Sequence, residues 1–207
     1  MLNNTGFDML ANNYDKYVGL SYENNVYPFF GYKNLLNTIY NNINIKDTGK
    51  ILDIGFGTAT LTKKLYGDNY DIFGVNFFRE MINIAKEKMP NSNLFCYNFS
   101  NGLQKNIKDE KFDFIISTYA IHHLTNIQEI KFFRLLYTML NNNGKMFIGD
   151  VAFYTKKELN KCKQDNIDCW ANNEIYITFD FLKRNLKDFN MYFKPISFCN
   201  GIVCIEK

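Results

Sequence analysis

Short, almost wholly apolar runs alternate with amphipathic segments through the middle of the chain. Runs typical of strands are KILDIG (50–55), YDIFGVN (70–76), NLFCYNF (93–99), KFDFIISTY (111–119) and KMFIGDVAF (145–153). Segments between them, such as FFREMINIAKEKM and IQEIKFFRLLYTML, carry apolar residues at helical spacing. Strands that are apolar on both faces and separated by helices indicate a parallel sheet covered on both sides. This alternation predicts an α/β, Rossmann-like three-layer sandwich.

The segments on either side of this alternation add different elements. Apolar residues recur at helical spacing in residues 6–18 and 29–43, which predicts an N-terminal helical cap. Near the other end, two apolar runs flank Asn200-Gly201, a residue pair typical of hairpin turns. We therefore expect a mostly parallel seven-stranded sheet closed by a C-terminal antiparallel hairpin. Asn126, with Glu129 three residues later, predicts a capping pair for the helix that follows.

The length of 207 residues fits a single domain, and 46% hydrophobic residues supply a sizeable core. Within that domain we expect three parts. Residues 1–44 form a helical cap or lid, residues 45–153 form a ligand-binding core, and residues 154–207 form variable helices and the closing hairpin.

The composition excludes several classes of function. A net charge of +3, with no stripe of basic residues, gives no electrostatic footprint for nucleic acid. The longest apolar runs fall well short of the roughly 20 residues of a membrane span. The five cysteines form an odd set without a Cys-x-x-Cys pair, which indicates a reducing compartment and no metal site. We expect a cytoplasmic protein, a monomer or a homodimer, with no nucleic-acid or membrane partner.

The first strand runs into a glycine-containing turn, in ILDIGFGTATLTKKL (51–65). In a doubly wound sheet such a turn borders the ligand, because ligands lie at the carboxyl ends of the strands. A dinucleotide site needs glycines at the first, third and sixth positions of this turn. Gly55 and Gly57 supply two of them, but Thr60 stands at the sixth. The turn therefore disfavours a dinucleotide.

The same stretch resembles the first motif of the class I S-adenosylmethionine-dependent methyltransferases: an acidic residue followed by three glycines at alternate positions. DIGFGTA matches this motif except at Ala59, where the last glycine is expected. The resemblance extends over roughly residues 45–152. Asn76 ends the second strand where the family has an acid, CYNFS offers Asn98, and FDFIISTYAIHHL resembles the family's fourth motif, which ends in His-His-Leu.

The resemblance implies S-adenosylmethionine as cofactor, S-adenosylhomocysteine as product, and transfer of a methyl group to a small-molecule acceptor by in-line displacement. In the family's scheme Asp53 orients the ammonium side of the cofactor, Asn76 faces the ribose hydroxyls, and Asn98 lies near the adenine amine. The cofactor-binding residues that it implies are Asp53, Gly55, Gly57, Asn76, Phe77, Asn98, Phe99 and Tyr119.

Two residues are candidates for a catalytic role. His122 follows the fourth strand, beside His123, and these are the only two histidines of the chain. His122 could serve as a general base or an orienting group, or could simply pad its loop. Tyr14, with Tyr17, lies in a segment that resembles the lid of small-molecule members, where aromatic rings shield the sulfonium. The alternative for Tyr14 is a helix that packs on the sheet. Asp150, at the end of the fifth strand, is expected by position to face the same crevice; the alternative is a residue that caps a helix or lies in a solvated loop.

Two further classes of function stay open. An amide replaces a carboxylate at Asn76 and Asn98, which is consistent with a degenerate methyltransferase fold that binds or senses the cofactor, or acts as a scaffold, without catalysis. A nicotinamide oxidoreductase is disfavoured by Thr60 and by the lack of a Tyr-x-x-x-Lys pattern.

Overall fold

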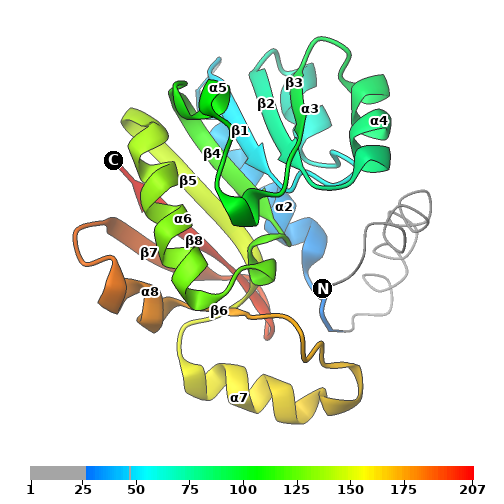
Figure 1. The fold of residues 1–207 in the computed structure, drawn as a ribbon. Coiled ribbons are helices and arrows are strands. Elements are labelled where there is room, and N and C mark those ends of the chain that lie inside the picture. The colour runs from blue at the N-terminus through cyan, green and yellow to red at the C-terminus, as the bar shows by residue number, and fades with distance from the viewer. Residues whose placement is uncertain (1–26, 47) are drawn as a thin grey trace.

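A computed structural model describes residues 27–46 and 48–207 (Figure 1). Its sheet has the strand order β3-β2-β1-β4-β5-β8-β7, and β6 pairs with β5 outside this series. The strands are β1 (Lys50–Ile54), β2 (Asp71–Asn76), β3 (Asn93–Cys96), β4 (Phe112–Thr118), β5 (Leu140–Phe153), β6 (Ile177–Thr178), β7 (Asn190–Pro195) and β8 (Asn200–Glu206). All neighbouring strands pair in parallel except β8, which is antiparallel to β5 and β7.

Helices cover both faces of this sheet (Figure 1). The α-helices are α2 (Tyr32–Ile43), α3 (Thr62–Gly67), α4 (Arg79–Lys88), α5 (Lys105–Lys108), α6 (Asn126–Met139), α7 (Lys156–Asp165) and α8 (Phe179–Asn185). Three short 3-10 helices are η1 (Phe99–Asn101), η2 (Ile121–His123) and η3 (Ile167–Cys169).

The core is divided by the sheet into two large apolar clusters. Leu52 of β1 packs in the cluster that includes α6 and α8, whereas the preceding Ile51 packs in the cluster that includes α2 and α3. This division follows from strand geometry, because successive side chains point to opposite faces. The predicted three-layer α/β fold is confirmed. The closing strands β7 and β8 are antiparallel as expected, and the two-residue β6 is an addition.

The predicted hairpin is present, but the prediction of its turn is wrong. Asn200 and Gly201 lie within β8, paired with Val151 and Asp150, and the connection from β7 ends before them. Gly201 is needed for close packing, because a Cβ atom there would lie 2.4 Å from the Phe193 ring. Asn200 is buried, and its Nδ2 donates to the carbonyl of Phe30, outside the hairpin.

The predicted cap of α6 is also wrong, by one position. Thr125 is the N-cap, its hydroxyl accepts from the backbone N–H of Gln128, and Gln128 closes the reciprocal bond. Both Thr125–Gln128 and Asn126–Glu129 have the spacing of a capping box. The difference is that Glu129 is 5% exposed and points into the protein.

The N-terminal cap is described only from Tyr27 onward, so residues 6–18 and Tyr14 lie outside the described residues. Helix α2 packs its Leu35 and Ile39 onto the sheet, so closely that a Cβ atom on Gly149 would lie 2.5 Å from Leu35. No helix of the described part of the chain is long and apolar enough to cross a membrane.

Candidate cofactor and acceptor site

The glycine turn lies where the strand order reverses, between β1 and β4. Gly55 has φ 74° and Gly57 has φ 56°, left-handed values that favour glycine. A Cβ atom on Gly55 would also lie 2.3 Å from Cβ of Ala120, just after β4. Ala59, at the third motif position, adopts φ 64° and is fully buried with Phe56. The turn therefore keeps its left-handed shape where alanine replaces glycine.

A hollow lies against this turn. It is lined by Tyr32, Asp53, Gly55, Phe56, Gly57, Thr58, Thr60, Leu61, Thr62, Thr118 and Tyr119. Four of the eight predicted cofactor-binding residues are among these. The structure thus brings Asp53, both glycines and Tyr119 together around one space at the carboxyl end of β1.

Asp53 is the buried acid of this hollow. Its side chain is 2% exposed, and Oδ2 accepts a hydrogen bond from the hydroxyl of Thr62. Within the part of the chain that the structure describes, Oδ1 is buried and has no hydrogen-bond partner. Burial raises the pKa of Asp53 to about 7, although the bond from Thr62 opposes this rise. A buried carboxylate oxygen of this kind fits a cationic hydrogen-bond donor such as an ammonium group.

Asn76 ends β2 and does not line the hollow. Its Oδ1 accepts from the backbone N–H of Phe77 at 2.7 Å. Its Nδ2 donates to the carbonyl of Gly57 and to Sδ of Met81, both at 3.4 Å. The amide therefore ties the end of β2 to the glycine turn. A carboxylate has no hydrogen to donate, so it could not make the bond to the Gly57 carbonyl.

The two predicted adenine-side residues follow β3. Asn98 caps η1, since its Oδ1 accepts from the backbone N–H of Ser100 at 3.0 Å. Phe99 is 6% exposed, packs against Phe132, and lies 3.7 Å from the position of a Cβ atom on Gly55. The Phe99 ring thus lies in van der Waals range of a side chain placed at Gly55. Neither residue lines the hollow.

Tyr119 continues the wall of the hollow towards the N-terminal part of the described chain. Its ring lies 5.2 Å from that of Phe29 and 5.4 Å from that of Tyr32, between centroids. Its hydroxyl accepts from Nδ2 of Asn200 at 3.0 Å, and the same amide donates to the carbonyl of Phe30 at 2.6 Å. Asn200 therefore fixes this aromatic wall against the sheet, a role that its sequence context did not predict.

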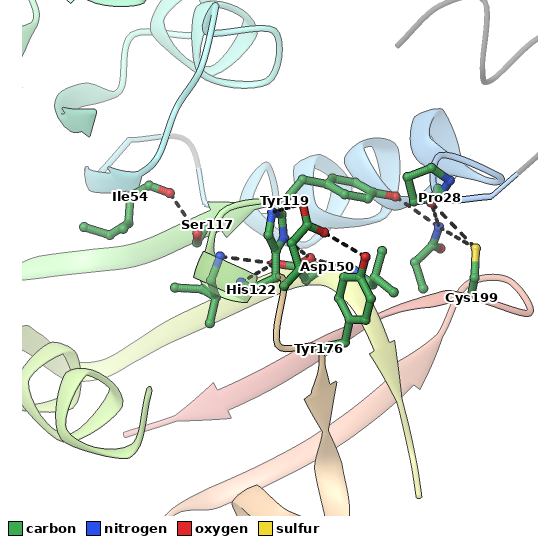
Figure 2. A network of polar contacts seen from close by, with 12 residues as sticks. Pro28, Ile54, Ser117, Tyr119, His122, Asp150, Tyr176 and Cys199 are labelled. Atoms are coloured by element: carbon green, nitrogen blue, oxygen red, sulfur yellow. Dashed lines mark hydrogen bonds and ion pairs between the residues drawn. The ribbon is translucent and has the colours of Figure 1, made fainter. Parts of the chain in front are cut away.

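His122 and Asp150 form a buried pair beside Tyr119 (Figure 2). Nδ1 of His122 lies 2.8 Å from Oδ1 of Asp150. The Asp150 carboxylate also accepts from the backbone N–H groups of Ile121, His122 and Val151. Because Nδ1 faces a carboxylate, it carries the proton in the neutral ring, and Nε2 keeps its lone pair.

Charges around the ring raise its basicity. Burial alone would lower the pKa of His122, but Asp150 and, more weakly, Glu174 raise it above the usual value. Nε2 of His122 lies 3.8 Å from Oε1 of Glu174. Glu174 belongs to the stretch around Trp170 for which the sequence predicts no element, so no signal marked it as a site residue.

The comparisons with known proteins agree with this geometry. Residues 52–148 match a family described as a methyltransferase domain. An uncharacterized methyltransferase of Alkaliphilus oremlandii (strain OhILAs) is 33% identical over 164 residues, which cover 77% of this chain and 74% of that protein.

Solved structures share the fold at low sequence identity. An S-adenosylmethionine-dependent methyltransferase from Clostridium acetobutylicum ATCC 824 has a TM-score of 0.67 at 13% identity, over 93% of this chain and 98% of that chain. Magnesium protoporphyrin IX methyltransferase from Synechocystis PCC 6803 with bound SAH has a TM-score of 0.67 at 13% identity, over 86% of this chain and 84% of that chain. The strand order and the glycine turn thus define a Rossmann-like α/β protein, a fold that these solved structures share. The chain belongs to the class I S-adenosylmethionine-dependent methyltransferase family.

Proposed function

We propose that this protein transfers a methyl group from S-adenosylmethionine to a small-molecule acceptor. The observation that carries the proposal is Asp53, which lines the hollow at the glycine turn and whose buried Oδ1 lacks a partner among the described residues. The amino group of the cofactor supplies the cationic donor that this atom fits. Structures with SAH and SAM bound, such as those of magnesium protoporphyrin IX methyltransferase, support the same ligand for this fold.

The remaining cofactor contacts follow from the order of the strand ends. Gly55 and Gly57 let the ligand approach the backbone, since neither has a Cβ atom to fill the turn. Asn76 and Phe77 stand at the end of β2 on the ribose side, and Asn98 with Phe99 follows β3 on the adenine side. Tyr119 closes the hollow from β4.

The chemistry requires alignment more than a reactive side chain. The cofactor supplies a methyl group on a sulfonium, which an acceptor lone pair displaces in line. The protein gains rate by holding the acceptor at that angle and by excluding water. His122 is the general base that we assign, because Asp150 fixes its proton on Nδ1 and leaves Nε2 to accept one. Tyr14, which lies outside the described residues, is assigned to the lid.

Several properties complete the proposal. One domain carries the activity, with residues 1–44 as cap or lid, residues 45–153 as core and residues 154–207 as variable region. All five cysteines are free thiols, which supports action in the cytoplasm. We expect a monomer or a homodimer.

A second function is favoured by one observation. The amide of Asn76 is engaged with Phe77, Gly57 and Met81, so its contribution to ribose binding is limited. A protein that binds the cofactor without catalysis is consistent with this arrangement.

One experiment separates the two functions. The protein is incubated with S-adenosylmethionine and a panel of amines, alcohols, thiols and carboxylic acids, and S-adenosylhomocysteine is measured. Formation that depends on one acceptor and falls at least tenfold in His122→Ala supports catalysis. Cofactor binding without any turnover across the panel supports the second function.

A further inference from the structure

A strap outside the parallel core faces Nε2 of His122, the nitrogen assigned as the general base. It consists of residues 170–176, between η3 and β6, and the backbone N–H of Ile175 donates to the carbonyl of His122 at 2.9 Å. This bond places Glu174 beside the ring, with Oε1 3.8 Å from Nε2. Figure 2 shows Tyr176 of the same strap next to His122 and Asp150.

Glu174 is held in position by a chain of hydroxyl groups. Tyr176 donates to Oε2 of Glu174 at 2.7 Å, and Tyr27 donates to the hydroxyl of Tyr176 at 2.5 Å. The Tyr27 ring stacks on Trp170 at 5.2 Å between centroids, and both rings are buried. One oxygen of Glu174 is thereby fixed by the protein, and the other is directed at Nε2.

The charged groups that interact with His122 give its surroundings a negative character. Asp150 of β5 and Glu174 of the strap are both acidic. Glu129 of α6 is neutral over most of the neutral range, because burial and Asp150 raise its pKa to about 8. Burial of its ring and the charge on His122 lower the pKa of His123 to about 4. Burial raises the pKa of the Tyr27 and Tyr176 hydroxyls, so these stay protonated.

We propose that the acceptor presents a protonated amine to this pair, with its nitrogen between Nε2 of His122 and Oε1 of Glu174. The proposal rests on the proposed function and names its substrate class. A nitrogen at a hydrogen-bond distance of about 2.8–3.0 Å from each atom closes a triangle whose base is the observed 3.8 Å. Carboxylate and phosphate acceptors are disfavoured, because they would face two carboxylates.

The proton balance follows from this placement. One N–H of the ammonium group gives its proton to Nε2, and the resulting imidazolium is stabilised by Asp150 through Nδ1. The freed lone pair forms the new N–C bond to the methyl carbon, while the electron pair of the breaking C–S bond stays on sulfur. The imidazolium then releases its proton to solvent. Glu174 takes part in no bond change and acts as the counter-ion of the amine.

The test uses the imidazole of His122 as a probe of binding. His123→Asn leaves His122 as the only histidine, so ¹⁵N-histidine labelling reports on one ring. In saturating S-adenosylhomocysteine, this protein is titrated with 2-phenylethylamine, 2-phenylethanol and 3-phenylpropanoate. These probes share an aromatic body and differ in charge. We expect the Nε2 resonance to shift with the amine, which binds at least about tenfold tighter than the alcohol.

Two further variants complete the test. Glu174→Gln is expected to remove most of the amine's advantage, to within about threefold of the alcohol. Glu110→Gln, which removes a carboxylate that pairs with Lys50 elsewhere, is the matched control and should leave the preference unchanged. Equal binding of the three probes, no shift with any of them, or a preference that survives Glu174→Gln would overturn the proposal. Failure to bind S-adenosylhomocysteine would instead overturn the proposed function.

Discussion

The contact between Gly55 and Ala120 gives a sharp prediction about the strand ends that form the site. Gly55→Ala introduces a methyl group 2.3 Å from Cβ of Ala120, in a residue with φ 74°. Gly57→Ala is the matched control, because Gly57 has φ 56° but, among the residues that the structure describes, no atom lies within 4 Å of the new Cβ. Both variants place alanine in a left-handed backbone conformation. Only Gly55→Ala also brings its new methyl group against Ala120.

The two effects have different sizes. A non-glycine residue in the left-handed region costs roughly 1–2 kcal/mol. Overpacking in a rigid environment adds about 1–3 kcal/mol. Gly57→Ala should therefore lower the free energy of unfolding by roughly 1–2 kcal/mol, and Gly55→Ala by roughly 2–5 kcal/mol. Ala120→Gly removes the opposing methyl group. In combination with Gly55→Ala it should therefore restore most of the free energy of unfolding that is lost to the clash.

The backbone and clash contributions to the free energy of unfolding are measured by urea unfolding of four variants. These are Gly55→Ala, Gly57→Ala, Ala120→Gly and the Gly55→Ala/Ala120→Gly double variant. A coupling of about 1–3 kcal/mol between positions 55 and 120 is expected. Equal destabilisation at 55 and 57, or additive effects in the cycle, would refute the reasoning. Gly57→Ala carries a second readout. Its methyl group enters the hollow, so affinity for S-adenosylhomocysteine should fall while the protein stays folded.

Two other substitutions address the acid and amide of the cofactor site. The pKa of Asp53 is raised to about 7 in the folded protein, so its contribution to stability is present at low pH and is lost as the pH rises through 7. Asp53→Asn should therefore raise the free energy of unfolding at pH 8, by up to about 4 kcal/mol, with little change at pH 4. An equal effect of the substitution in urea unfolding at pH 4 and pH 8 would contradict this. Asn76→Asp should tighten binding of S-adenosylhomocysteine about tenfold, through charge-assisted hydrogen bonds to the ribose. The same variant should have a lower thermal unfolding midpoint, because the hydrogen bond to the Gly57 carbonyl is lost. Unchanged affinity would remove Asn76 from the ribose site.

The sequence was most informative where periodicity or backbone shape restricts the choice of residue. Gly55 and Gly57 carry the left-handed turn, and the apolar runs carry the strands on both sides of it. These features depend on local geometry, which sequence patterns record directly. The fold class and the place of the turn were therefore predictable.

Features that depend on tertiary packing were not predictable. Gly201 matched a hairpin turn, but its lack of a side chain serves the approach of Phe193 within the sheet. Glu129 matched a capping pair, but it is buried and interacts electrostatically with Asp150. Glu174 has no motif at all, since its place beside His122 comes from the strap that crosses η2. In each case the deciding contact joins residues of different structural elements.

Calorimetric titration with S-adenosylhomocysteine at pH 7, in two buffers of different ionisation enthalpy, tests the central claim most directly. If Asp53 receives the amino group of the ligand, binding fixes its carboxylate in the ionised form. The protein should then release about half a proton, because the pKa of Asp53 lies at about 7. Asp53→Asn should bind at least tenfold more weakly and release no proton from this site. The absence of binding heat in the unmodified protein, or equal affinity and proton release in Asp53→Asn, would contradict the account.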